Sequence, residues 1–68
     1  MYNYQKLLGR MKEFDVTQEK LSEMSHICFT NLNKSLNNKR LFRQDEIIHI
    51  CDALQISYSK IPLYFFTS

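Results

Sequence analysis

The apolar residues of this chain recur at intervals of three and four positions, which is the spacing of a buried helix face. From Tyr4 to Phe14 this spacing predicts a first helix over residues 3–13. It predicts further helices at about 18–24, 28–36 and 44–54. The last segment, Tyr58 to Phe66, is dense in apolar and aromatic residues. The pattern therefore indicates a chain built from short helices.

Residues at the expected boundaries support these helices. Thr17 is a good N-cap, and Val16 and Leu21 are spaced as a hydrophobic staple around it. Asn37 and Asn38 favour an end to the third helix, because asparagine tolerates the left-handed conformation. We therefore expect the second helix to start after Thr17 and the third to stop at the Asn pair.

Composition narrows the fold class. The chain has 68 residues, of which 44% are hydrophobic and 24% charged, as in ordinary globular domains. It has one glycine and one proline, too few for the tight turns of a small all-β domain. We predict an all-α fold, a single compact domain of five short helices over residues 1–68.

Gly9 and Pro62 have special positions in this pattern. Gly9 falls inside the first helix, where glycine costs about 1 kcal/mol relative to alanine. We interpret it as a place where another backbone comes close. Pro62 is expected either in the first turn of a last short helix or in an extended tail.

Several function classes are disfavoured. No apolar run reaches the roughly 20 residues that a membrane span needs, and the first residues lack the apolar stretch of a signal peptide. The chain has no glycine-rich phosphate loop and no paired acid–base residues. We expect a cytoplasmic protein that is not an enzyme, needs no cofactor and does not contact a membrane.

The two cysteines each close the same tripeptide, His26-Ile27-Cys28 and His49-Ile50-Cys51. Two histidines and two cysteines are a ligand set that zinc accepts. However, helix positions two apart point about 200° apart, unlike the spacing of zinc fingers. We interpret the cysteines as free thiols and predict no metal site.

Charge is unevenly distributed along the chain. The net charge is only +2, but residues 24–44 contain four basic residues and no acid, namely Lys34, Lys39, Arg40 and Arg43. Such segregation can build a basic face for nucleic acid on a nearly neutral protein. From charge alone, these basic residues could equally well be ordinary solvated surface.

Three motifs carry a family resemblance over nearly the whole chain. They are Thr17-Gln18-Glu19-Lys20-Leu21, then Thr30-Asn31-Leu32-Asn33-Lys34, then Leu36-Asn37-Asn38-Lys39-Arg40. Together they resemble the lambda-repressor-like (Cro/XRE-type) helix-turn-helix family. Two further segments resemble small Cro-like regulators of Gram-positive temperate phages, namely Phe42-Arg43-Gln44-Asp45-Glu46-Ile47-Ile48 and Ile61-Pro62-Leu63-Tyr64-Phe65-Phe66. The resemblance implies a five-helix domain whose recognition helix spans about 28–36.

The family pattern also implies roles for individual residues. The protein would be a sequence-specific transcriptional regulator, such as a repressor, that binds a double-stranded operator in a bacterial host cell. The base-reading positions would be Phe29, Thr30, Asn33 and Lys34. The phosphate-contacting positions would be Gln18, Asn37, Asn38, Lys39 and Arg40. Alternatively, Phe29 is a core residue, and Lys39 and Arg40 only compensate the helix dipole.

The chain departs from the family at the turn, Ser25-His26-Ile27-Cys28-Phe29. Ser25 replaces an apolar residue, His26 replaces a glycine with positive φ, and Cys28 replaces a capping Ser or Thr. Phe29 replaces a polar residue that would read bases. These changes favour an alternative, a helix-turn-helix-derived module that binds a repressor or host protein instead of DNA. A phage structural protein that merely keeps the fold is a third hypothesis.

The tail predicts a dimer interface. Four consecutive large residues end the apolar pattern, Leu63, Tyr64, Phe65 and Phe66. A surface helix hides only part of such a run against its own core, so we expect the rest to face a second copy. The alternative is that the whole tail folds back onto the residues Leu7, Met11 and Ile50.

Overall fold

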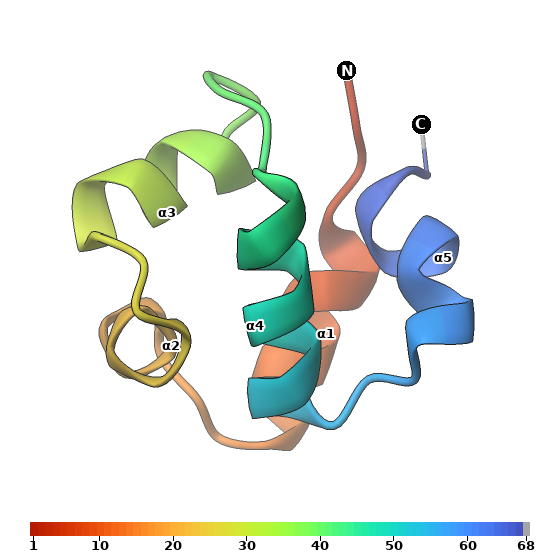
Figure 1. Cartoon of the computed structure of the whole chain (residues 1–68), viewed down its shortest axis with the longest axis horizontal. Helices are drawn as coiled ribbons and strands as arrows, with labels where there is room; N and C mark the ends of the chain where they lie inside the picture. The colour runs from red at the N-terminus through yellow and green to blue at the C-terminus, as the bar shows by residue number, and fades with distance from the viewer. Residues whose placement is uncertain (68) are drawn as a thin grey trace.

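The computed structural model describes residues 1–67, and all its regular structure is helical (Figure 1). The elements are α1 (Gln5–Glu13), α2 (Gln18–Ser25), α3 (Phe29–Leu36), α4 (Gln44–Leu54), the 3₁₀ turn η1 (Tyr58–Lys60) and α5 (Ile61–Phe65). No strand occurs among the described residues. The all-α prediction is confirmed, and the predicted boundaries lie within two residues of these.

The helices pack around α4. It contacts α2 and α5, while α2 also contacts α3, and α1 also contacts α5. Figure 1 shows α2 nearly end-on and α3 running across the view, so these two consecutive helices cross steeply. The α3 helix lies at the edge of the molecule, on the far side of α4 from α5. This arrangement leaves one long face of α3 uncovered.

The core follows the predicted apolar spacing. Its fully enclosed side chains include Leu7, Leu21, Leu32, Ile50 and Leu54, contributed by α1, α2, α3 and α4. Three aromatic rings complete it near the chain ends. Phe42 meets Tyr4 and Phe65 edge-to-face, at centroid distances of 5.5 and 5.4 Å. Pairs of this geometry add to what apolar burial contributes.

The aromatic stack corrects one predicted interface residue. Phe65 is only 1% exposed, so its assignment to a dimer interface is wrong. Pro62 lies in the first turn of α5, as one of the two predicted alternatives required. The five residues of α5 then turn Phe65 inward onto Phe42, so part of the tail does fold back onto the core.

The predicted helix boundaries have the expected local chemistry. The Thr17 hydroxyl accepts a hydrogen bond from the Lys20 amide at 3.1 Å, which confirms it as the N-cap of α2. His26, at the end of α2, has a φ of 59°, and Asn38, after α3, has a φ of 61°. Both residues thus take the left-handed conformation at the positions where the sequence predicted that a helix ends.

Gly9 does not have the role expected from its position. A β-carbon built on it meets nothing within 4 Å, so no other backbone approaches there and that interpretation is wrong. The residue is exposed and lies inside α1. Gly9 therefore only lowers the stability of α1.

A partly buried network fixes the end of α3 against α4. Both terminal nitrogens of Arg40 donate to the Glu46 carboxylate, at 3.1 and 3.3 Å. Arg40 also donates to the hydroxyl of the buried Ser35 at 2.8 Å. Glu46 further accepts from the Arg43 amide at the start of α4, at 2.9 Å. One carboxylate thus ties Arg40 and Arg43, in the loop after α3, to the first turn of α4.

Replacing Gly9 with alanine should stabilise the protein. We expect Gly9→Ala to raise the free energy of unfolding by about 0.5–1 kcal/mol, because it adds helix propensity without a clash. Urea unfolding measures the change. Lys6→Ala, at another exposed position of α1, is the control and should change stability little. A destabilised Gly9→Ala would reveal a contact at this position.

Removing the Arg40 guanidinium should destabilise the protein strongly. Arg40→Met leaves the buried Glu46 carboxylate without its main partner, which we expect to cost about 2–3 kcal/mol in urea unfolding. The control is Arg43→Met. Arg43 pairs with Asp45 at 3.3 Å, but their side chains are 71% and 56% exposed, so its loss should cost under about 0.5 kcal/mol. Equal losses would contradict the structural role of Arg40.

Candidate nucleic-acid interface

The α3 helix has a buried face and an exposed polar face. Leu32 and Ser35 point inward and are fully buried. Thr30, Asn33 and Lys34 are exposed on the opposite side. These three predicted base-reading residues therefore share one accessible helix face.

The connection between α2 and α3 is a turn of three residues, 26–28. The His26 amide donates to the Ser22 carbonyl, which closes the end of α2. Ile27 inserts into the core, and Cys28 precedes α3 without a capping hydrogen bond from its side chain. The buried Ser25 hydroxyl donates to the Leu21 carbonyl at 2.6 Å. This bond within its own helix lets a polar residue occupy a core position.

A chain of side-chain amides links the start of α2 to α3. The Asn33 side-chain NH₂ donates to the Gln18 side-chain oxygen at 3.2 Å. Asn37 in turn donates to the Asn33 side-chain oxygen at 3.3 Å and to its carbonyl at 2.8 Å. Gln18, which was predicted to contact phosphate, and Asn33, which was predicted to read bases, thus lie in contact. The bond uses the Gln18 oxygen and leaves its NH₂ group as the donor that a phosphate requires.

Phe29 is exposed at the start of α3. Its side chain is 44% accessible, so the interpretation of Phe29 as a core residue is wrong. Cys28 beside it is exposed as well. The start of α3 therefore presents apolar side chains next to its polar face.

Two of the residues predicted to contact phosphate also make hydrogen bonds within the fold. The Asn38 side chain accepts from the Tyr2 amide and donates to the Tyr2 carbonyl, both at 2.8 Å. Arg40 is held by Glu46 and Ser35 as described above. Both side chains thus have a structural role, and their assignment to phosphate stays a prediction. Lys39, between them, is exposed together with Asn37.

The two thiols differ in environment. Cys28 is exposed at the N-terminal end of α3, where the amides of Asn31 and Thr30 favour the thiolate and lower its pKa. Cys51 is buried in α4, and desolvation raises its pKa. Among residues 1–67, no group of three or more His, Cys, Asp or Glu side chains is placed to hold a metal ion. The helices of the described chain also include none long and apolar enough to cross a membrane.

A second surface lies on the opposite side, around α5. Leu63 and Phe66 are 44% and 51% exposed, while Tyr64 is half-buried against the core. Next to them is an apolar groove of about 380 Å³, lined by Phe42, Gln44, Ile47, Ile48, Ile61 and Phe66. The exposed Leu41 extends the same side through Phe42. Leu41, Ile48 and Ile61 were not predicted to belong to this surface, although an apolar Leu-Phe pair inside a basic loop was a signal for it.

One family includes this chain. No curated protein matches the sequence. A protein family described as "Protein of unknown function (DUF739)" matches residues 1–68, the full length of the sequence. The chain belongs to this family.

Proposed function

We propose that the protein is a sequence-specific DNA-binding transcriptional regulator of the lambda-repressor-like helix-turn-helix type. The exposed polar face of α3, joined to α2 by the Gln18–Asn33 hydrogen bond, carries this proposal. A major groove about 12 Å wide admits a single helix. Because α3 lies at the edge of the molecule (Figure 1), it enters the groove without a clash from α1 or α5.

The exposed face of α3 has suitable chemistry for base edges. Lys34 donates to guanine O6 and N7, and an asparagine such as Asn33 pairs with adenine through two hydrogen bonds. The methyl group of Thr30 and the ring of Phe29 pack against thymine methyls. The contact between Gln18 and Asn33 orients the Asn33 amide before DNA arrives, which lowers the entropic cost of binding.

The backbone of the duplex lies on either side of α3. The Gln18 NH₂ group and the start of the eight-residue α2 face one strand, where amides and the helix dipole favour phosphate. Lys39, in the loop after α3, adds a positive charge toward the other. These contacts hold α3 in register but carry no sequence information.

A homodimer would join two such units through the surface around α5. Leu63 and Phe66 of each copy would fill the groove beside Ile48 and Ile61 of the other, an arrangement that two-fold symmetry satisfies twice. Two recognition helices then read half-sites about 34 Å apart. The operator would be an inverted repeat.

A second candidate function is binding to a repressor or host protein. The exposed Phe29 and Cys28 favour it, because apolar side chains at the start of α3 resemble a protein-contact surface. The two functions differ in salt dependence, since only phosphate contacts release counterions in proportion to their number.

Titration against DNA tests the α3 assignments. Binding is measured on the duplex upstream of the protein's own gene and on a scrambled duplex, at two salt concentrations. Lys34→Ala should weaken the specific complex by about 1–3 kcal/mol and relax preference at one base pair. Lys39→Ala should weaken both complexes similarly and lower the salt slope by about one.

The matched control for these lysines is Lys60→Ala, at an exposed position of η1. It should leave DNA affinity unchanged. Salt-independent binding, or no binding to either duplex, would favour the protein-binding function. Equal behaviour of the Lys34 and Lys39 variants would contradict the separation of base and phosphate contacts.

Substitutions on α5 test the dimer. The double variant Leu63→Ser, Phe66→Ser should be a folded monomer with weakened operator binding, because it removes exposed apolar area without opening the core. Light scattering at tens of micromolar measures the association that weak dimers show. Leu8→Ser is the matched control, since Leu8 is 43% exposed on α1 and lies in a different groove. A double variant that remains dimeric would contradict this interface.

A further inference from the structure

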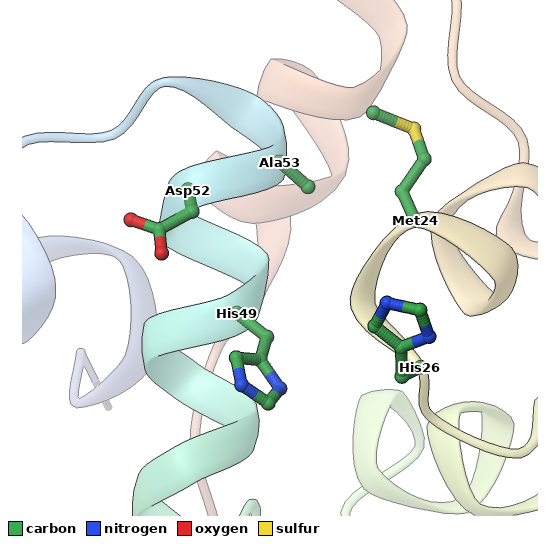
Figure 2. Close-up of a pocket in the computed structure, with 5 residues that line it drawn as sticks. All are labelled: Met24, His26, His49, Asp52 and Ala53. Atoms are coloured by element: carbon green, nitrogen blue, oxygen red, sulfur yellow. The ribbon is translucent and has the colours of Figure 1, made fainter.

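The two histidines of the chain meet in space although 23 positions separate their identical tripeptides. His26 and His49 line an open groove of about 430 Å³ together with Met24, Asp52 and Ala53. Their ring centroids are 6.5 Å apart, and their planes are inclined at 83°. Figure 2 shows the two rings side by side across the groove, one from the end of α2 and one from α4.

The backbone fixes where both histidines lie. His26 ends α2 in the left-handed conformation, and its side chain lies on the α4 side of the turn (Figure 2). His49 lies on the exposed face of α4, the helix on which α2 packs. Within residues 1–67, neither imidazole makes a hydrogen bond. Both rings are exposed, so their nitrogens are accessible from solvent.

We propose that His26 and His49 form a two-histidine binding site for a borderline divalent transition-metal ion, with Zn²⁺ as the representative ion. Zinc bonds to imidazole nitrogen at about 2.0–2.1 Å, so two imidazoles on one tetrahedral ion have ring centres about 5 Å apart. The observed 6.5 Å is longer than this, so the rings must move closer together to share an ion. Small side-chain rotations of two exposed residues bring the nitrogens onto one ion.

The remaining coordination positions belong to water. Asp52 lies one turn beyond His49, but its carboxylate points away from His26 in Figure 2 and accepts a hydrogen bond from the Tyr58 hydroxyl at 2.6 Å. It adds negative charge beside the ion without binding it. Cys51 is buried and Cys28 does not line the groove, so the four-ligand site of both tripeptides does not form. Imidazole ligands favour zinc, nickel and copper over magnesium or calcium.

The bound ion would connect the end of α2 to α4. Because the unfolded chain does not hold the two rings together, the ion stabilises the folded state. At a free Zn²⁺ concentration about ten times Kd, the melting temperature should rise by about 5–10 °C. Mg²⁺ at the same concentration should leave it unchanged. These measurements involve no DNA and are therefore independent of the proposed regulatory function.

Variants of the intact chain assign the site. His26→Asn keeps a residue that tolerates the left-handed conformation, and His49→Gln keeps a polar helix residue. Each should weaken Zn²⁺ binding at least tenfold by calorimetry and remove most of the melting shift. Cys28→Ser should bind Zn²⁺ like the parent protein, which separates the imidazole site from the exposed thiol. In ¹H NMR, the signals of both imidazoles should move together as one ion binds per chain.

Three results would overturn the proposal. The first is an unchanged melting temperature in excess Zn²⁺. The second is a Zn²⁺ effect that survives in His49→Gln or disappears in Cys28→Ser. The third is a titration in which only one imidazole responds. Circular dichroism of each variant without metal verifies that its fold is intact, so a lost Zn²⁺ response reports on the ligands.

Discussion

The placement of α3 depends on the partly buried ion pair between Arg40 and Glu46. The arginine reaches back from the loop to the start of α4 and also holds the hydroxyl of Ser35, on the buried side of α3. The carboxylate in turn accepts a hydrogen bond from the amide of Arg43, the residue that precedes α4. A helix that must expose one whole face has little apolar area with which to anchor itself. A charged network at its C-terminal end adds to the anchor that the buried Leu32 provides.

Apolar spacing and capping residues predicted the helices well, because the start and end of a helix depend on residues close to them in the sequence. Thr17 caps α2 as expected, and Asn38 takes the left-handed conformation after α3. The roles of Asn38 and Arg40 could not be predicted in this way. Each looks like a surface residue in a basic loop, and only the folded chain brings Tyr2 or Glu46 within hydrogen-bonding distance. The sequence also could not predict that the Phe65 side chain points into the core, since a helix of five residues is too short to show a periodicity.

The turn between α2 and α3 shows how the chain tolerates residues that the family resemblance disfavours there. Ser25 satisfies its hydroxyl within α2, and His26 accepts the left-handed conformation at a cost of about 1 kcal/mol. Cys28 leaves the start of α3 without a side-chain cap. Two buried apolar side chains hold the crossing of the two helices, Ile27 within the turn and Leu32 in α3. The exposed side chains at the start of α3, Cys28 and Phe29, are apolar as well.

The aromatic stack of Tyr4, Phe42 and Phe65 has a consequence for how the protein folds. It joins the beginning, the middle and the end of the described chain, whereas α2, α3 and α4 are sequence neighbours. Contacts between distant segments require loop closure, and closing a longer loop costs more entropy. We therefore expect α2, α3 and α4 to pack together early in folding and the aromatic stack to form last. During synthesis, α3, the helix proposed to read DNA, would form before Phe65, whose ring completes the core, has been added to the chain.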